Sequence, residues 1–366
     1  MFTAGLGQLG GIGGGVGEAM AISLPLSAAG KSFNEAADAK TTVEVELAQV
    51  KIAAQKAAAA GEPADDARIS ALENELQRRA AEVEKLRPAN RDALTWATII
   101  TAITAVMLAL GRYGFIQTFA TVLVAGFTLV TVVNVIALQF NPAWAVQWGD
   151  LVAGLSFRLP PSSGPQSSPL ATALKTFGII GVGASELVAY PYWCLEKGYA
   201  RFTGPRDESA AWGERARGWM RVLRWDAWCS MVVYTFATLA FYLLGAAILG
   251  RSGLNPSNDD LIRTLSVMYE PVFGRFADVL FLLGAFAVLY STFFVANAGH
   301  GRVFTDAMRV IGLIGSNPRT LKRSVRCLSA VFPCLCLLIY WQYPKPANLV
   351  LFSGLMQAMM LPMLAG

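Results

Sequence analysis

The sequence has 366 residues, of which 54% are apolar and only 15% are charged. Soluble globular proteins carry about 25% charged residues, so this composition excludes a soluble enzyme. The formal net charge of +5 sits mostly in short loops between apolar stretches, which excludes a nucleic-acid-binding protein with one basic surface. We therefore expect a polytopic integral membrane protein.

Eight stretches are long and apolar enough to cross a hydrocarbon core of about 30 Å, which takes about 20 residues. They are residues 4–26, 94–110, 115–139, 170–195, 227–250, 276–298, 325–341 and 347–366. Each should be a helix, because a segment inside the bilayer must satisfy its backbone hydrogen bonds internally. The prediction is an all-α, multi-pass protein of a bacterial inner membrane or a plasma membrane.

Residues 1–30 form the first predicted membrane helix, and eight of residues 5–17 are glycine. Pairs such as Gly7 and Gly11 have the small-xxx-small spacing of closely packed membrane helices. The same stretch formally matches a dinucleotide-binding fingerprint, but no strand precedes it, so helix packing is the better interpretation. Glu18 lies deep in this segment, where a carboxylate is costly and is therefore a candidate functional residue.

Residues 31–91 differ from the rest because Ala, Glu, Lys, Arg and Gln dominate them. Apolar residues recur at helical spacing on both sides of a turn signal at residues 61–63, namely Val43, Leu47, Val50, Ile69, Leu72, Leu76, Val83 and Leu86. This pattern predicts an extramembrane antiparallel coiled-coil hairpin inserted after the first span. A single solvated helix or a partly disordered loop would have a similar composition. The hairpin is also a candidate surface for a partner outside the cytoplasm.

Residues 92–366 should form a membrane helix bundle of about seven spans. Two of its loops, 196–226 and 299–326, carry seven and six Lys or Arg residues, whereas the loops on the opposite side carry at most three each. Because basic loops stay in the cytoplasm, these two loops should be cytoplasmic and the hairpin extracytoplasmic. Residues 212–225 combine tryptophans with four arginines and predict a separate amphipathic helix at the inner membrane surface.

The fourth span, 170–195, contains the best candidate site. Several glycines precede Glu186, and Pro191 follows it five residues later. This combination predicts a helix interrupted near the membrane midplane, between about Gly181 and Pro191, with Glu186 facing the protein interior. Backbone carbonyls and a carboxylate could together hold a hard cation, or Glu186 could carry a proton. A glutamate that only hydrogen-bonds to a neighbouring helix, or a kink at Pro191, would explain the same residues.

Other polar residues of the spans carry weaker signals. Ser353, Gly354 and Gln357 interrupt the last span and face either a pathway or a neighbouring helix. His300 is the only histidine, which excludes a His-based zinc site, and we expect it at the interface or in helix packing. No Ser/His, paired-aspartate or HExxH arrangement is present, so we expect no enzymatic activity.

Several stretches resemble the Nramp family of divalent metal transporters, which has the LeuT-type inverted-repeat fold of the APC superfamily. The resemblance is carried by Leu108-Ala-Leu-Gly-Arg-Tyr-Gly114, Gly183-Ala-Ser-Glu-Leu187, the segment from Gly284 through Tyr290-Ser-Thr-Phe to Ala298, and the segment from Asn348 to Gly366 with Met360-Leu-Pro362. These stretches resemble the family's fourth and fifth, sixth, eighth and tenth helices, so residues 4–26 would be its third. The family's orientation agrees with the one derived from loop charges.

The resemblance implies secondary transport of a divalent cation of the Mn, Fe or Mg type, with the metal as substrate, no cofactor, and protons as the candidate coupling ion. It places the metal site at Ala184, Glu186 and Leu187. Further pathway candidates are Ser185, Gln357, Gly354 and Glu18. The family has a methionine three residues after the alanine, whereas Leu187 stands here, so an oxygen ligand from Glu186 would replace a soft thioether. This difference favours a magnesium-like ion, or another ion that the sequence does not determine, as in the divergent Nramp-related branch of the family.

The sequence also departs from the family at its start. The Asp-Pro-Gly-Asn motif of the family's first helix does not occur, and the resemblance begins at the third helix. We therefore expect a fragment lacking the first two helices, which would not transport metal by itself. Two alternatives stay open. One is a LeuT-fold transporter of an organic solute, in which the coding sequence upstream of Met1 would also lack an Asp-Pro-Gly-type first helix. The other is a non-transporting membrane scaffold, which would need an unbroken helix around Glu186.

Overall fold

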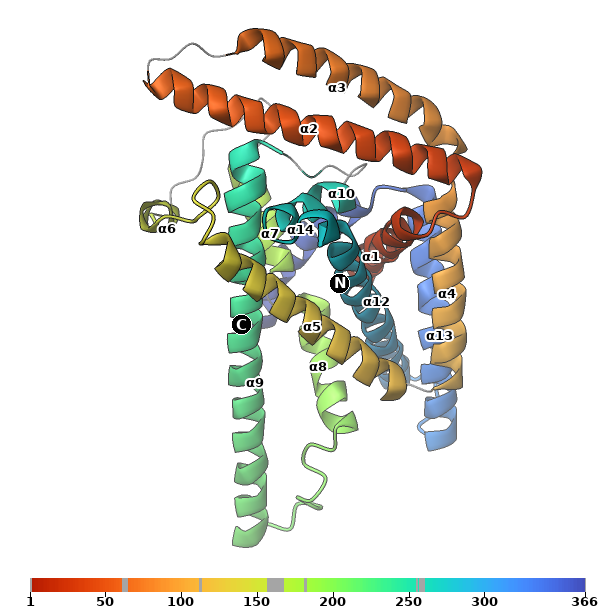
Figure 1. The fold of residues 1–366 in the computed structure, drawn as a ribbon. Helices are drawn as coiled ribbons and strands as arrows, with labels where there is room; N and C mark the ends of the chain where they lie inside the picture. Colours follow the sequence, from red (N-terminus) through yellow and green to blue (C-terminus); the bar gives the residue numbers. More distant parts are fainter. Residues whose placement is uncertain are drawn as a thin grey trace.

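The computed structural model describes residues 2–60, 65–111, 114–156, 168–180, 183–254, 256 and 261–365. Within these ranges the chain is largely helical and contains no strand (Figure 1). The helices are α1 (Phe2–Ser23), α2 (Ala28–Ala60), α3 (Asp66–Leu86), α4 (Asp92–Leu110), α5 (Gly114–Leu138), α6 (Trp148–Gly154), α7 (Pro169–Ile179), α8 (Ala184–Glu196), α9 (Ala210–Leu244), α10 (Leu261–Ser266), α11 (Glu270–Phe273), α12 (Ala277–Val310), α13 (Pro318–Gln342) and α14 (Pro346–Ala365).

Seven helical segments of the described chain are long and apolar enough to cross a membrane. They are Asp92–Leu110, Thr121–Leu138, Pro169–Glu196, Ala210–Gly250, Leu261–Val310, Pro318–Gln342 and Pro346–Leu364. The prediction of an all-α polytopic membrane protein is confirmed. The eighth predicted span, α1, is apolar enough only together with α2, from which it is bent by 89°. Its many glycines lower its hydropathy, because glycine adds little apolar surface.

The glycines of α1 place this helix at the centre of the bundle. α1 contacts α4, α12, α13 and α14. A Cβ at Gly11 would lie 2.6 Å from the Pro346 carbonyl oxygen, and one at Gly14 would collide with the Tyr340 ring. These contacts need residues without side chains, so the predicted close helix packing is confirmed.

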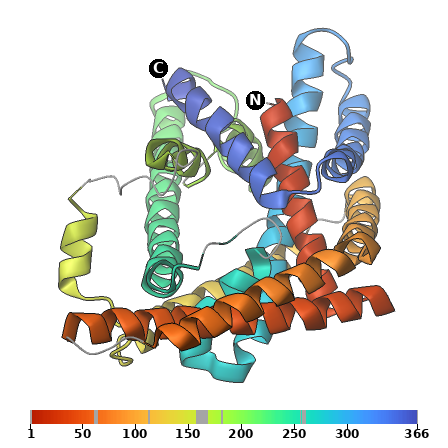
Figure 2. The ribbon, with the colours of Figure 1, turned by 90° about the horizontal axis from the view of Figure 1, so that it is seen from above.

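Helices α2 and α3 run side by side in opposite directions, as the hairpin pattern predicts (Figures 1 and 2). Phe33 of α2 packs with Val83 of α3 in a small apolar cluster near the base of the pair. Further out, the exposed Lys51 and Glu73 form an ion pair at 2.8 Å, and exposed pairs add little stability. The predicted turn at residues 61–63 lies outside the described residues.

The hairpin is joined to the bundle through Arg263 on α10. This residue is only 7% exposed, and its guanidinium donates to the Asp38 carboxylate and to the side-chain oxygen of Asn34, each at 2.7 Å. Asn34 in turn donates to the Ala21 carbonyl of α1 at 2.9 Å. A buried guanidinium needs such partners, because an unpaired buried charge is costly. Helix α2 thus connects α10 with the end of α1.

Helix α9 corrects one prediction. The sequence predicts a separate surface helix over 212–225, whereas the structure has one continuous helix from Ala210 to Leu244. No proline interrupts this stretch, so the basic segment and the apolar span continue one another. At about 1.5 Å per residue, a helix of 35 residues exceeds the thickness of the hydrocarbon core, so the basic half of α9 extends beyond it.

Two apolar clusters are prominent in the described interior of the bundle, and a smaller one joins α4 and α12 around Phe294. One joins α5, the end of α9 and α12 around Tyr269, whose ring stacks on Phe127 with ring centroids 5.9 Å apart. The other joins α1, α12 and α13 around Phe293 and Phe332. The outer faces of α5 and α9 keep large apolar side chains exposed, such as Val233, as helices that face lipid do.

Candidate functional site

The fourth predicted span consists of two helices. α7 ends at Ile179, Ile180 and Gly183 have extended backbones (ψ 127° and 161°), and α8 begins at Ala184. The two helices form one candidate span, Pro169–Glu196, so the break lies inside the apolar segment. The predicted interruption is present, although residues 181 and 182 lie outside the described chain. Pro191 does not cause it, because this proline lies inside the continuous α8.

Glycines next to the break bring α14 close to α7. A Cβ at Gly178 would collide with the Gly354 carbonyl oxygen, and a Cβ at Gly354 would lie 2.6 Å from the Lys175 carbonyl oxygen. α7 therefore packs backbone to backbone on α14, which is one unbroken helix. Gly354, a predicted pathway residue, serves this packing.

Side-chain oxygens gather at the first turn of α8. Ser185 donates its hydroxyl to the Glu186 carboxylate at 3.0 Å. A Cβ on Gly183 would collide with both Glu186 Oε2 and Gln357 Oε1, so these two oxygens lie on the same side of Gly183. Gln357 comes from α14. Residues that are about 170 positions apart in the chain therefore lie side by side at the break. The close packing of α7 on α14 brings them together.

Gln357 is only 1% exposed. One of the two polar atoms of its side-chain amide has a hydrogen-bond partner among the described residues. Its Nε2 donates to Gln8 Oε1 of α1 at 2.6 Å, whereas its Oε1 is buried without a hydrogen-bond partner among the described residues. The hydroxyl of Ser353, one turn earlier on α14, is also buried without a partner there. A buried acceptor without a partner costs about 1–3 kcal/mol. A donor or a cation at Gln357 Oε1 would remove that cost.

The predicted metal-site residues do not share one orientation. Ala184 and Ser185 are buried, whereas Glu186 is exposed and Leu187 is 45% exposed. The prediction that Glu186 faces the interior is wrong. α12 and α14 cover the face of α8 that carries Ala184 and Ser185, and the side chains of the next two residues point away from that face. The Glu186 side chain nevertheless folds back along α8, so its Oε2 atom lies beside Gly183 at the start of the helix.

Glu18 lies half-buried on α1, ten residues from Gln8, which is about 15 Å along a helix. It therefore does not join the oxygen cluster at the break. Sequence reasoning missed Gln8, whose signal is a lone amide among the glycines of α1. His300 is 8% exposed and lies edge-on to Phe332, so of its two predicted positions helix packing is the observed one.

The donor atoms at the break are all oxygens. Among the residues that the structure describes, no three His, Cys, Asp or Glu side chains gather as metal ligands. The break offers instead one carboxylate, one amide oxygen and one hydroxyl. Oxygen ligands of this kind suit Mg²⁺, Ca²⁺ or Mn²⁺ better than soft metal ions.

One protein family matches this chain. The family model described as natural resistance-associated macrophage protein-like, or Nramp, matches residues 88–366. The matched range contains α4 to α14, and with them the helix break and Gln357, whereas α1, α2 and α3 precede it. No curated protein and no solved structure matches the chain.

Proposed function

The chain belongs to the Nramp family of divalent metal transporters, and on that premise we propose that it moves a hard, magnesium-like divalent cation through the α7–α8 break. Proteins of this family are multi-pass membrane transporters of the LeuT-type fold, and the metal is their substrate. The choice of ion, the coupling to protons and the binding residues are the parts that we propose for this chain.

The unpartnered Gln357 Oε1 beside the Glu186 carboxylate is the observation that supports this proposal most directly. Both groups present negative charge to the same small region, and neither can donate a hydrogen bond to the other while Glu186 is ionised. The C-terminal end of α7 adds the negative end of a helix dipole. A cation satisfies all of these acceptors at once, which a neutral ligand with few donors does not.

The side chains at the break favour a hard ion. Leu187 stands where the family has a methionine, and it is 45% exposed and offers no sulfur. A carboxylate, an amide oxygen and backbone carbonyls are the ligands that Mg²⁺ and Ca²⁺ take. The proposal is therefore a site with a lower preference for soft ions than a thioether-containing site would have.

Protons are the coupling ion in this proposal, and Glu186 is the group that exchanges them. A divalent cation and a proton compete for the same carboxylate, so cation binding and proton exchange are linked. The apparent Mn²⁺ affinity of the purified chain should then fall as the pH is lowered. Glu186→Gln should remove this dependence, because an amide carries no titratable proton.

Cation binding by the 366-residue chain in lipid nanodiscs tests the site. Mn²⁺ serves as the probe, because its EPR signal distinguishes bound from free ion, and Mg²⁺ serves as the competitor. Glu186→Gln and Gln357→Leu should each weaken Mn²⁺ binding by about tenfold or more, as losses in a metal's surroundings do. Gln49→Leu, at an exposed position on α2, is the matched control and should leave the affinity unchanged.

Three outcomes would overturn the proposal. One is Mn²⁺ binding that both site variants leave intact, and the second is Mn²⁺ binding that Mg²⁺ does not displace. The third is a chain that binds no divalent cation but whose melting temperature rises with an organic solute, which would favour the organic-solute transporter. The melting temperatures of the variants and of the parent chain are compared as a control. Where they are equal, a loss of affinity comes from the binding site and not from unfolding.

A further inference from the structure

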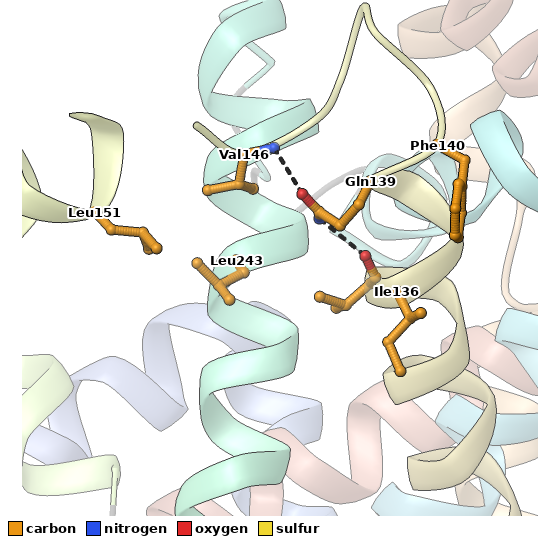
Figure 3. Close-up of a pocket in the computed structure, with 7 residues that line it drawn as sticks. Ile136, Gln139, Phe140, Val146, Leu151 and Leu243 are labelled. Atoms are coloured by element: carbon orange, nitrogen blue, oxygen red, sulfur yellow. Dashed lines mark hydrogen bonds between the residues drawn. The ribbon is translucent and has the colours of Figure 1, made fainter. Parts of the chain in front are cut away.

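An apolar groove lies between the last turns of α5, the segment that leads into α6, and α9 (Figure 3). Its walls include Val135 and Ile136 of α5, Val146 and Leu151 of the following segment, and Leu243 of α9. Its volume is about 320 Å³, at the lower end of the range of ligand sites. The groove is separate from the α7–α8 break, and no residue of the proposed cation site lines it.

Among the described residues that line the groove, Gln139 has the one polar side chain, and part of its hydrogen-bonding capacity is used within the protein. Its Oε1 accepts a hydrogen bond from the Val146 amide at 3.1 Å, and its Nε2 donates to the Val135 carbonyl at 2.9 Å (Figure 3). One lone pair of the amide oxygen and one N–H of the amide group remain. The other lining side chains are apolar, so a polar solute that entered the groove would replace few of its hydrogen bonds to water, and the groove favours a hydrocarbon occupant.

The outer wall of the groove is held in place by specific contacts. Arg251, directly after the π-helical end of α9, donates to the Ala145 carbonyl at 3.1 Å and to the Asp150 carboxylate at 2.7 Å. Asp150 also accepts a hydrogen bond from the Gln147 amide, which closes the first turn of α6. These contacts tie the segment that carries Val146 to α9, so the groove is a built feature and not a gap beside a loose loop.

The groove continues the lipid-facing surface of the two spans beside it. Ile136 on α5, which lines the groove, and Leu239 on α9, one turn from the lining residue Leu243, are exposed within candidate membrane spans. Phe140 is 85% exposed and Trp148 is 78% exposed, just beyond the end of α5. Aromatic side chains at the ends of spans lie at the level of the lipid headgroups. Because Phe140 lines the groove, the groove lies at the interfacial end of α5, beside the lipid-facing surface of this span.

We propose that this groove binds one acyl chain of a bilayer phospholipid, which wedges between α5 and α9 below their interfacial ends. The chain covers apolar surface that the protein leaves uncovered and requires no polar partner from Gln139. The headgroup lies near Trp148, outside the groove. This inference is independent of the proposed cation site, since the two share no residue.

Photocrosslinking in vesicles tests the proposal. The full chain is reconstituted in phosphatidylcholine that carries a diazirine on one acyl chain, and labelled peptides are located by mass spectrometry. Labelling of residues 135–151 should exceed labelling of the equally lipid-exposed stretch around Val233 on α9. Leu243→Trp fills the groove and should abolish this excess. Leu239→Trp, one turn away on the same helix but outside the groove, is the matched control and should preserve it.

A second variant protects the test against misfolding. Ile136→Trp fills the groove from the α5 side and should abolish the same excess if Leu243→Trp lowers expression. The purified parent chain should also retain one phospholipid in native mass spectra, and both filling variants should lose it. Uniform labelling along α5 and α9, an excess that survives both filling variants, or crosslinks from this groove to a second copy of the chain would each overturn the proposal.

Discussion

Asp92, the first residue of α4, holds the corner between α1 and α2, and its removal tests how that corner is stabilised. The residue is 4% exposed. Its carboxylate accepts three hydrogen bonds, from the Leu26 amide at 2.7 Å, the Ser27 amide at 3.1 Å and the Ser27 hydroxyl at 2.7 Å. A Cβ at Gly30 would collide with the same carboxylate, so α2 begins directly against it. Ser27 caps the first turn of α2 by accepting a hydrogen bond from the Gly30 amide at 2.9 Å, and Asp92 holds this capping residue in place.

The expected size of the effect follows from these bonds. Asp92→Ala leaves two backbone N–H donors and one hydroxyl without their acceptor. A hydrogen bond to a charged group contributes about 1.5–3 kcal/mol. Water can enter the space that the carboxylate leaves and recover part of this loss, so we expect the local opening free energy to fall by about 3 kcal/mol. Each 1.4 kcal/mol changes an equilibrium about tenfold, so the Leu26 and Ser27 amides should lose roughly a hundredfold in protection.

Hydrogen exchange followed by mass spectrometry in nanodiscs measures this loss on peptides that cover residues 24–30. Asp92→Asn should give an intermediate loss, because the amide oxygen can keep the two backbone donors, while a neutral amide group replaces the charged carboxylate and the oxygen that accepts from the Ser27 hydroxyl. Asp65→Ala is the control, since Asp65 makes a single exposed hydrogen bond to the Arg68 amide at 3.1 Å. It should affect only the start of α3. Unchanged protection of residues 24–30 in Asp92→Ala would refute the reasoning.

The fold predicts three further outcomes. In a background without the native cysteines, a cysteine at Ser70 should react with a membrane-impermeant reagent from outside and one at Ser209 should not, and the reverse pattern would overturn the orientation. Gly17→Ala should lower the melting temperature by several degrees, because a Cβ there would collide with the α4 backbone, whereas Gly218→Ala, with open space around it, should not lower it. The Ser209 hydroxyl and amide lower the pKa of Asp207 by hydrogen bonding to its carboxylate. At pH values above the ordinary aspartate pKa of about 4, Asp207 is ionised and this contact stabilises the start of α9. The stabilisation is lost as the pH falls through the lowered pKa of Asp207. Exchange protection in the first turn of α9, corrected for intrinsic rates, should fall over that acid range and should be low at every pH in Asp207→Ala.

The spans could be predicted from the sequence because the bilayer leaves few choices. A segment of about 20 apolar residues has to be a helix there, whatever its neighbours are. The same rule explains where the prediction was incomplete. The basic segment before the span of α9 lies outside the hydrocarbon. There, a separate surface helix and an extension of the membrane helix have similar sequences. No proline separates the two parts of α9, so the helix continues from one into the other.

The site could be predicted only in part, since its local and its long-range features differ. The break before Ala184 has a local signal, because Gly181 and Gly183 lie two positions apart in the sequence and glycine lowers the stability of a helix. The orientation of Glu186 depends on which face of α8 other helices cover, and α12 and α14 come more than 80 residues later. The Gln357–Gln8 hydrogen bond joins residues 349 positions apart. No spacing within one segment indicates such a pair.

The segment before the family match is a structural part of the bundle. Helices α1 to α3 precede the matched range of 88–366, yet two buried charged residues inside that range have their partners in the earlier segment. Asp92 accepts hydrogen bonds from residues 26 and 27, and Arg263 donates to residues 34 and 38. A buried charge without its partner costs several kcal/mol, so neither residue would be stable in a bundle that lacked this segment. The hairpin therefore does not behave as an appendage. Residues 26–38 supply the groups that neutralise Arg263 and hydrogen-bond to Asp92, and further along α2 Val45 packs against the apolar cluster around Tyr269.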